Sequence, residues 1–299
     1  MSQPANEPAP APSLRQMPRR YLALGLIVVA IVLLGALVIV RDNSATSTPT
    51  VETFTAASSS LVSTVSSVPA SVYNAVGVSS PANPVTPPAR AGNGNAPTWL
   101  ATVNGGPPLP VVFFYGAEFA PYPAVERWPL IMALSRFGTF SQLGLMQSSS
   151  TTAFANLSTF TFWKVSYTSR YLILESVERY SSLNPTGARY LGLETPDARQ
   201  AAAVASYGTS PNTFSLLDVA NRYTLGGSSF SPAVLSGLSQ DQIAGYLSTP
   251  TSPMTQAMVT AANEITASIC SVDGDRPGAV CDSKGVLAAD QVLKISPPH

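Results

Sequence analysis

The longest apolar stretch of the chain covers residues 21–40, which read YLALGLIVVAIVLLGALVIV and carry no charge. A helix of this length spans about 30 Å, the thickness of the hydrocarbon core of a bilayer. A helix buried inside a soluble domain rarely has apolar side chains on every face. The pattern therefore predicts a transmembrane helix over residues 21–40.

The charges around this run predict its orientation. Three arginines and one acidic residue, Glu7, lie in residues 1–20, whereas Arg41 behind the run is followed at once by Asp42. Because positive charge is retained on the cytoplasmic side, we expect residues 1–20 to form a cytoplasmic tail and the remainder to lie outside. A cleaved signal peptide is the alternative. We favour an uncleaved signal anchor, since the run is longer than a usual signal core and no small-x-small site closes it.

Composition then separates a linker from a folded domain. Residues 41–60 are mostly Ser, Thr, Ala and Pro, which cannot bury a core and predict a tether. Apolar residues recur at steps of four and three over residues 61–76, which predicts one helix face that Gly77 ends. We expect the extracytoplasmic domain to cover residues 61–299, with a loop over residues 79–97.

The next pattern predicts a strand that turns directly into a helix. Residues 111–115, VVFFY, lie between Pro110 and Gly116 and predict a buried parallel strand. Apolar positions at helical spacing follow over residues 121–137. Pro129 lies inside this helix, where it removes one backbone hydrogen bond and is expected to produce a kink.

Two strands and a helix are expected in the middle of the chain. Alternating apolar positions predict strands at residues 157–166 and 171–177. Thr195 followed by a proline predicts the start of a helix. That helix is expected to continue to Tyr207 and to end at Gly208.

The C-terminal part predicts a hairpin and further helices. Residues 213–219 and 222–225 flank Ala220-Asn221, a hairpin signal because Asn tolerates positive φ. Helices are expected to begin at Ser231, Ser239 and Ser252, the second with a capping box to Gln242. One mixed β-sheet flanked by helices, with extra helices at the C-terminus, is the simplest α/β packing of these elements.

The charge and the histidine content of the chain argue against several kinds of partner and active site. The 299 residues have a formal net charge of +0 and 11% of them are charged, so we expect no nucleic-acid partner, which would need a basic face. The single histidine, His299, is the last residue, which argues against a Ser-His-Asp triad or a histidine metal site in the domain. Asp273-Gly274-Asp275 lacks the further acidic ligands of a calcium loop. We therefore expect neither a metal ion nor a cofactor.

The corner between strand and helix carries a long motif. Residues 116–140 read GAEFAPYPAVERWPLIMALSRFGTF, and the expected element order around them is that of thioredoxin-like domains. The motif resembles the membrane-anchored domain-of-unknown-function family 929 (DUF929), whose members tend to read G-A-E-aromatic-C-P-Y-C-A-A-E-R-W and then A-L-S-R-F-G-T-F. Other segments that look like the family extend the resemblance over residues 61–281. The resemblance implies a thioredoxin-like domain behind a membrane anchor.

The chain departs from the family pattern at the positions that redox chemistry requires. Ala120 and Pro123 stand where the pattern has its two cysteines, so neither an attacking nor a resolving thiol is available. By the same alignment, Ser215 stands where thioredoxin-like folds place a cis-proline facing the pair. Because proline has no N–H, the first helical turn is also a poor anion site. We expect no catalytic residue here. The candidate binding surface consists of Phe119, Pro121, Tyr122 and Ser215.

Acidic residues around the corner allow two interpretations. Glu118 and Glu126 could act as an acid/base pair, but Glu118 precedes the helix and the spacing of eight separates them. We favour ion pairs of either glutamate with Arg127 or Arg136.

The two cysteines, Cys270 and Cys281, follow the last long helix. Outside the cytoplasm an isolated pair usually forms a disulfide, and closing so short a loop stabilises a fold by roughly 3 kcal/mol. A redox-active pair is the alternative interpretation. Two thiols without a nearby histidine do not complete a zinc site.

These observations favour a single-pass protein of the cell membrane, anchored by residues 21–40, with a thioredoxin-like domain outside that has lost its redox pair. Such a domain is expected to bind an extracytoplasmic protein or peptide, or to serve as a structural module, and not to be an enzyme. The alternative is a thiol–disulfide oxidoreductase that uses Cys270 and Cys281. A small-molecule carrier with an apolar pocket beside the corner is a third hypothesis.

Overall fold

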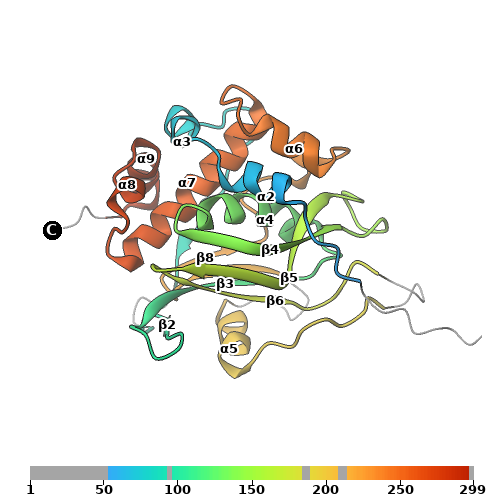
Figure 1. Ribbon diagram of the computed structural model, residues 1–299, viewed down its shortest axis with the longest axis horizontal. Coiled ribbons are helices and arrows are strands. Elements are labelled where there is room, and N and C mark those ends of the chain that lie inside the picture. Colours follow the sequence, from blue (N-terminus) through green and yellow to red (C-terminus); the bar gives the residue numbers. More distant parts are fainter. Residues whose placement is uncertain (1–52, 93–95, 184–188, 208–213, 296–299) are drawn as a thin grey trace, which may run out of the picture. The chain divides into compact units, whose positions relative to one another are not determined.

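The computed structural model describes residues 53–92, 96–183, 189–207 and 214–295, which belong to one compact unit (Figure 1). The expected transmembrane helix at residues 21–40 lies outside the described residues. Within them, none of the helices combines the length and the apolar character that crossing a bilayer requires.

The N-terminal part of the domain forms two helices where the sequence predicted one. Helix α2 (Ser59–Ser66) and helix α3 (Ala70–Val76) are separated at Pro69, whose side chain disfavours helical backbone in the residue before it. The prediction of a single helix was wrong for this reason. Gly77 ends α3 with a φ of 59°, as expected from its position.

A short strap precedes α2 and holds the start of the domain to strand β4 (Gly138–Gln147). Leu145 donates its N–H to the carbonyl of Thr55 at 2.7 Å, and Ala57 donates to the carbonyl of Leu143 at 2.9 Å. The described residues before Leu61, where the domain was expected to start, are therefore already paired with the domain.

The central sheet is mixed, as predicted. Strand β3 (Leu109–Gly116) lies in its middle, with β6 (Ile173–Glu178) parallel on one side and β7 (Ser215–Val219) antiparallel on the other. The hairpin partner β8 (Tyr223–Gly226) follows β7. Two short strands complete the sheet, β1 (Ala89–Arg90) beside β8 and β2 (Leu100–Ala101) beside the start of β3.

The predicted hairpin between β7 and β8 is confirmed. Both turn residues adopt positive φ, 55° at Ala220 and 59° at Asn221, which a two-residue hairpin turn of this type requires. Asp218 supports the turn because its Oδ1 accepts a hydrogen bond from the N–H of Asn221 at 2.7 Å.

Helices cover both faces of the sheet (Figure 1). Helix α4 (Pro121–Leu134) and helix α7 (Pro253–Asp273) pack on one face and contribute to the larger core. Helix α5 (Ala198–Ser206) packs on the other face over a smaller core. Helix α5 begins two residues later than predicted, since Asp197, not Thr195, caps it with a capping box to Gln200.

The C-terminal helices were only partly predicted. A 3₁₀ turn, η2 (Pro232–Leu235), and helix α6 (Gln240–Tyr246) follow Ser231 and Ser239, and the expected capping box to Gln242 is present. Two further helices, α8 (Gly278–Cys281) and α9 (Lys284–Leu293), were not predicted.

A second, two-stranded sheet joins β4 to β5 (Ser158–Ser169). The sequence predicted part of β5 but not β4, which begins at Gly138, where only the end of a helix was expected. A Cβ atom at Gly138 would lie 2.3 Å from the carbonyl oxygen of Thr168, so close pairing of the two strands requires glycine there.

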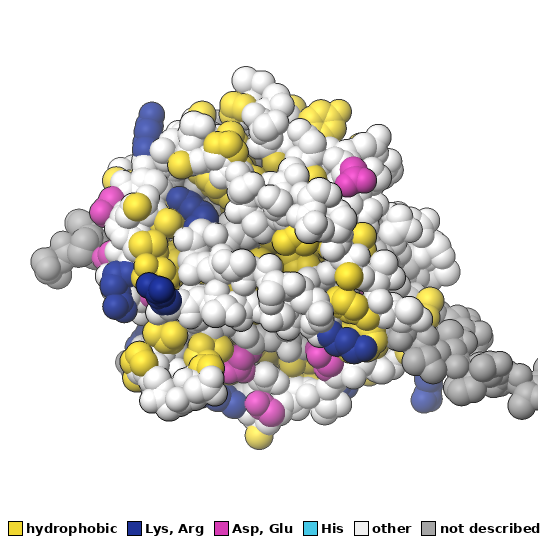
Figure 2. All heavy atoms as spheres, in the orientation of Figure 1, with side chains coloured by type: hydrophobic (Ala, Val, Ile, Leu, Met, Phe, Trp, Pro, Cys, Tyr) yellow, Lys and Arg dark blue, Asp and Glu magenta, His cyan; other side chains and the backbone are white. Residues whose placement is uncertain are grey.

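The surface follows the low charge content of the chain. In Figure 2, acidic and basic side chains are scattered singly among uncharged polar atoms, and apolar side chains form small groups between them. Recognition on such a surface depends on shape and on apolar or hydrogen-bonding contacts more than on a strong field.

Candidate functional site

The corner between β3 and α4 holds the two positions that correspond to the cysteines of the family motif. Ala120 is the N-cap of α4 and makes no side-chain capping bond, and Pro121 and Pro123 lie in the first turn. Ala120 is 8% exposed and Pro123 is buried. The side chains at these two positions are hydrocarbon only, so neither position supplies a thiol.

Backbone hydrogen bonds fix this corner rigidly to neighbouring loops. Glu118 donates its N–H to the carbonyl of Tyr180 at 2.8 Å, and the carbonyl of Phe119 accepts from the N–H of Ser149 at 3.1 Å. Arg179 donates to the carbonyl of Gly116 at 2.8 Å. The loops that follow β6 and β4 therefore form the walls of the corner.

Ser215, which the alignment places opposite the two cysteine positions, lies at the start of β7. It pairs with Gly116 across the β3–β7 ladder and is buried. Its hydroxyl group donates a hydrogen bond to the carbonyl of Gly227. The side chain therefore stabilises the end of the β7–β8 hairpin and does not present a free polar group to a ligand.

The other three predicted surface residues point to different surroundings. Tyr122 is 49% exposed and Pro121 is half-buried, so both are accessible from solvent. Phe119 instead enters a cluster of aromatic rings. Its ring stacks on that of Tyr190, with centroids 4.0 Å apart and planes 4° apart, and meets Phe214 edge-on at 5.3 Å.

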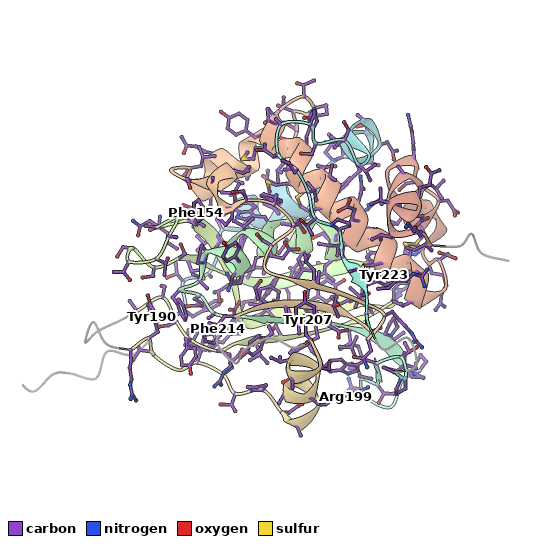
Figure 3. All side chains as sticks on the ribbon, turned by 180° about the vertical axis from the view of Figure 1, so that it is seen from behind. Phe154, Tyr190, Arg199, Tyr207, Phe214 and Tyr223 are labelled. Atoms are coloured by element: carbon purple, nitrogen blue, oxygen red, sulfur yellow. A yellow bond between two sulfur atoms is a disulfide. The ribbon has the colours of Figure 1, made fainter. Side chains whose placement is uncertain are left out.

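This cluster borders an open hollow of about 500 Å³ beside the corner. The residues that line the hollow are Phe119, Tyr180, Arg189, Tyr190 and Phe214. Figure 3 shows Tyr190 and Phe214 together at one edge of the molecule. We refer to these five residues as the aromatic hollow.

The sequence pointed to only one residue of the aromatic hollow. Tyr180 follows β6 and Phe214 precedes β7, so both lie at the same edge of the sheet as the corner. A signal was present, since aromatic residues adjoined predicted strand ends at this edge. The loop that brings Tyr190 over Phe119 has no repetitive pattern and could not be placed.

Beneath the corner, Arg127 forms a buried ion pair with Glu178 of β6. Its Nη2 lies 2.6 Å from Oε2 and its Nε lies 2.8 Å from Oε1, and both side chains are fully buried. Oε1 also accepts a hydrogen bond from the N–H of Phe162. The predicted pairing of Arg127 with Glu118 or Glu126 was wrong, because α4 turns this side chain toward β6, 51 residues away in sequence.

Glu126 and Arg136 are also held by polar groups from distant parts of the chain. The carboxyl group of Glu126 accepts hydrogen bonds from the N–H and the hydroxyl of Ser229, at 2.6 Å and 3.0 Å. Burial raises the pKa of Glu126 to about 8, an effect that the bonds from Ser229 oppose. Arg136 donates to the side chains of Asn263, Thr266 and Ser283. Both residues therefore hold helices and loops together.

The two cysteines form a disulfide, as predicted, between α7 and α8. Their Cα atoms are 5.7 Å apart, and Cys270 and Cys281 are only 2% and 3% exposed. The described residues contain no group of three or more His, Cys, Asp or Glu side chains placed to hold a metal ion.

Fold and site together define a mixed α/β domain whose strand-to-helix corner has Ala120 and Pro123 at the two cysteine positions and adjoins an aromatic hollow. The chain belongs to the DUF929 family, a domain of unknown function, whose family model matches residues 106–271. The resemblance carried by the corner motif is thereby confirmed. Comparison with curated proteins gave no match. Comparison with solved structures gave none either.

Proposed function

We propose that this chain is a membrane-anchored, redox-inactive thioredoxin-like protein that binds a segment of a partner protein outside the cytoplasm. The observation that carries the proposal is the aromatic hollow beside a corner without thiols. The corner has lost the groups for chemistry, while the surface next to it keeps the properties of a binding site.

The order of the strands supports the thioredoxin-like part of the proposal. Strands β6, β3, β7 and β8 lie side by side in that order, with β6 parallel and β7 antiparallel to β3. Helix α4 follows β3 directly. Thioredoxin-like domains have this order of core elements, and here β4 and β5 are inserted between the helix and the second core strand.

The chemistry of the aromatic hollow supports binding of a polypeptide segment. Aromatic side chains dominate its lining, and such rings are enriched at protein interfaces because they bury much area at little entropic cost. Its volume of about 500 Å³ accommodates one or two side chains. Tyr122, half-exposed on the adjacent turn, extends the contact surface toward the helix start.

The proposed location rests on the sequence of residues 1–60. The uncharged run at residues 21–40 is long enough to span a bilayer, and the arginines before it place the tail at residues 1–20 in the cytoplasm. Residues 41–60 then connect the anchor to the domain. The partner is accordingly an extracytoplasmic protein or peptide.

Burial of the disulfide argues against the alternative of a thiol–disulfide oxidoreductase. Exchange requires a thiolate to approach a sulfur atom in line, and both Cys270 and Cys281 are almost completely covered. The bond instead joins the end of α7 to α8.

The binding proposal predicts that the full chain in lipid nanodiscs selects peptides from a random display library. We expect the selected peptides to share an aromatic or large apolar residue, because the hollow buries such a side chain. Replacement of Phe119 by Ala removes the ring that stacks on Tyr190 and is expected to weaken binding about tenfold or more. Fluorescence anisotropy with the selected peptides measures the effect.

Tyr246→Ala serves as the matched control, since this tyrosine is 48% exposed on α6 and does not line the hollow. Its affinity is expected to equal that of the wild type. The proposal fails if no peptide is enriched over empty nanodiscs, or if Phe119→Ala binds as tightly as the wild type at an unchanged melting temperature.

A second prediction concerns the missing thiols. The variant Ala120→Cys with Pro123→Cys is expected to fold and to gain measurable insulin reduction in the presence of dithiothreitol, since it restores both thiols at a helix start. The wild type, which contains only the buried pair, is expected to be inactive. Insulin reduction by the wild type would contradict the redox-inactive assignment. A folded but inactive double variant would indicate that the corner has lost thioredoxin-like geometry.

A further inference from the structure

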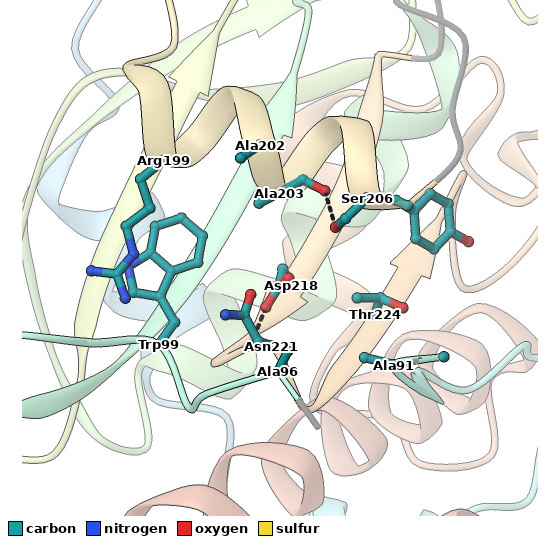
Figure 4. Close-up of a pocket in the computed structure, with 12 residues that line it drawn as sticks. Ala91, Ala96, Trp99, Arg199, Ala202, Ala203, Ser206, Asp218, Asn221 and Thr224 are labelled. Carbon is teal, nitrogen blue, oxygen red and sulfur yellow. Dashed lines mark hydrogen bonds between the residues drawn. The ribbon is translucent and has the colours of Figure 1, made fainter. Parts of the chain in front are cut away.

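A second hollow, of about 310 Å³, lies between α5, the β7–β8 hairpin and residues 91, 92, 96 and 99 (Figure 4). Much of its lining consists of residues without long side chains, which leave room between helix and sheet. These residues are Ala91, Gly92, Ala96, Ala202 and Ala203. The aromatic side chains of Trp99 and Tyr207 also contribute to the lining.

Asp218 presents a carboxyl group to this hollow from β7. It alternates along the strand with Leu217 and Val219, which face the larger core, and therefore shares the α5 face with Leu216. Figure 4 shows it between the hairpin turn and helix α5. The residue is 3% exposed.

The charge of Asp218 is incompletely compensated. Among the described residues, Asp218 accepts a hydrogen bond from the N–H of Asn221 alone and forms no ion pair. The nearest basic residue of the lining, Arg199, stacks over Trp99 at 4.8 Å and donates to the carbonyl of Leu100. Burial raises the pKa of Asp218 to about 6, so the group is still charged at neutral pH.

We propose that this hollow binds a small organic ammonium ion. The ammonium group pairs with Asp218, and its apolar part packs against the alanines of α5 and the ring of Tyr207. A buried carboxylate with one hydrogen bond is costly unless a cation or further donors satisfy it. The volume lies at the lower end of the range for ligand pockets.

The lining favours an organic cation over a metal ion. A single carboxylate does not supply the several oxygen ligands that calcium or magnesium takes, and the described residues hold no metal-binding cluster. Two neutral polar residues, Asn221 and Thr224, line the hollow near Asp218 and offer further acceptors for ammonium hydrogens.

Calorimetric titration of the full chain in nanodiscs tests this proposal with two probes of nearly equal shape, phenethylammonium and neutral 2-phenylethanol. Phenethylammonium is expected to bind about tenfold or more tightly than the alcohol, because both probes can donate a hydrogen bond to Asp218 but only the ammonium group forms an ion pair with it. In Asp218→Asn this preference is expected to disappear. Asparagine still accepts the hydrogen bond from Asn221, so the hairpin turn is retained.

Asp241→Asn provides the matched control, since this carboxylate is exposed on α6 and outside the hollow. It is expected to keep the preference for phenethylammonium. Absence of binding by either probe at millimolar concentration overturns the proposal. Equal affinities in the wild type, or an undiminished preference in Asp218→Asn at an unchanged melting temperature, overturn it as well.

Discussion

Replacement of Arg127 by Met is expected to lower the free energy of unfolding by about 3–5 kcal/mol, because it leaves Glu178 buried without its counter-ion. Both side chains are fully buried, and two hydrogen bonds of 2.8 Å and 2.6 Å join them. The guanidinium group also lies over the ring of Phe114, 5.3 Å from its centroid. Urea unfolding of the full chain in detergent, followed by the fluorescence of the buried Trp99 and Trp128, measures the loss.

The double variant Arg127→Met with Glu178→Gln separates the ion pair from simple packing. Glutamine removes the unpaired charge and keeps an oxygen that accepts the hydrogen bond from Phe162. The double variant is therefore expected to recover at least half of the stability that the single variant loses. A loss below about 1 kcal/mol in the single variant would mean that water or another group solvates Glu178.

Stability is expected to rise as the pH falls from 8 to 5. Burial raises the pKa of Glu126 to about 8 and that of Glu264 to about 7, and the negative charges of the two oppose each other. A carboxyl group with a raised pKa in the folded state binds protons more tightly there than in the unfolded chain. Its contribution to stability is therefore complete below its unfolded pKa of 4.5 and is lost as the pH rises through its folded pKa.

The melting temperature of the domain is therefore expected to be roughly 10 °C higher at pH 5 than at pH 8. Glu126→Gln keeps acceptor and shape beside Ser229 but cannot ionise. This variant is expected to melt higher than the wild type at pH 8 and to show a weaker pH dependence, because the contribution of Glu264 remains. Calorimetry between pH 5 and pH 8 measures the melting temperatures of the wild type and of the variant. A wild type that is most stable at pH 8 would show that water reaches these carboxyl groups.

Local signals in the sequence predicted the elements whose geometry depends on a few neighbouring residues. The hairpin at Ala220-Asn221 and the capping box of Ser239 with Gln242 are of this kind. The disulfide between Cys270 and Cys281 was predicted for a similar reason, because no other partner exists. The turn and the capping box depend on residues close to each other in the sequence. The disulfide depends on the cysteine count, because two cysteines allow only one pairing.

Elements and contacts that depend on tertiary packing escaped prediction. Strand β4 has no clear alternation of apolar positions, because irregularities in its pairing with β5 around Gln142 change which side chains face the core. The pairing of Arg127 with Glu178 required knowledge that β6 lies beside β3. The aromatic hollow likewise depends on loops that meet only at the edge of the finished sheet. The motif predicted that the corner lacks both cysteines, but it did not predict the aromatic hollow beside the corner.

On the proposed topology, the strap at residues 55–57 limits how far the domain can move from the membrane. With the proposed anchor at residues 21–40, only residues 41–52 are left between the bilayer and the described chain. Twelve residues reach at most about 40 Å when fully extended and about 20 Å as a flexible coil. On the proposed topology, the domain therefore stays within about 40 Å of the lipid, and a partner has to come within that distance of the membrane to bind it.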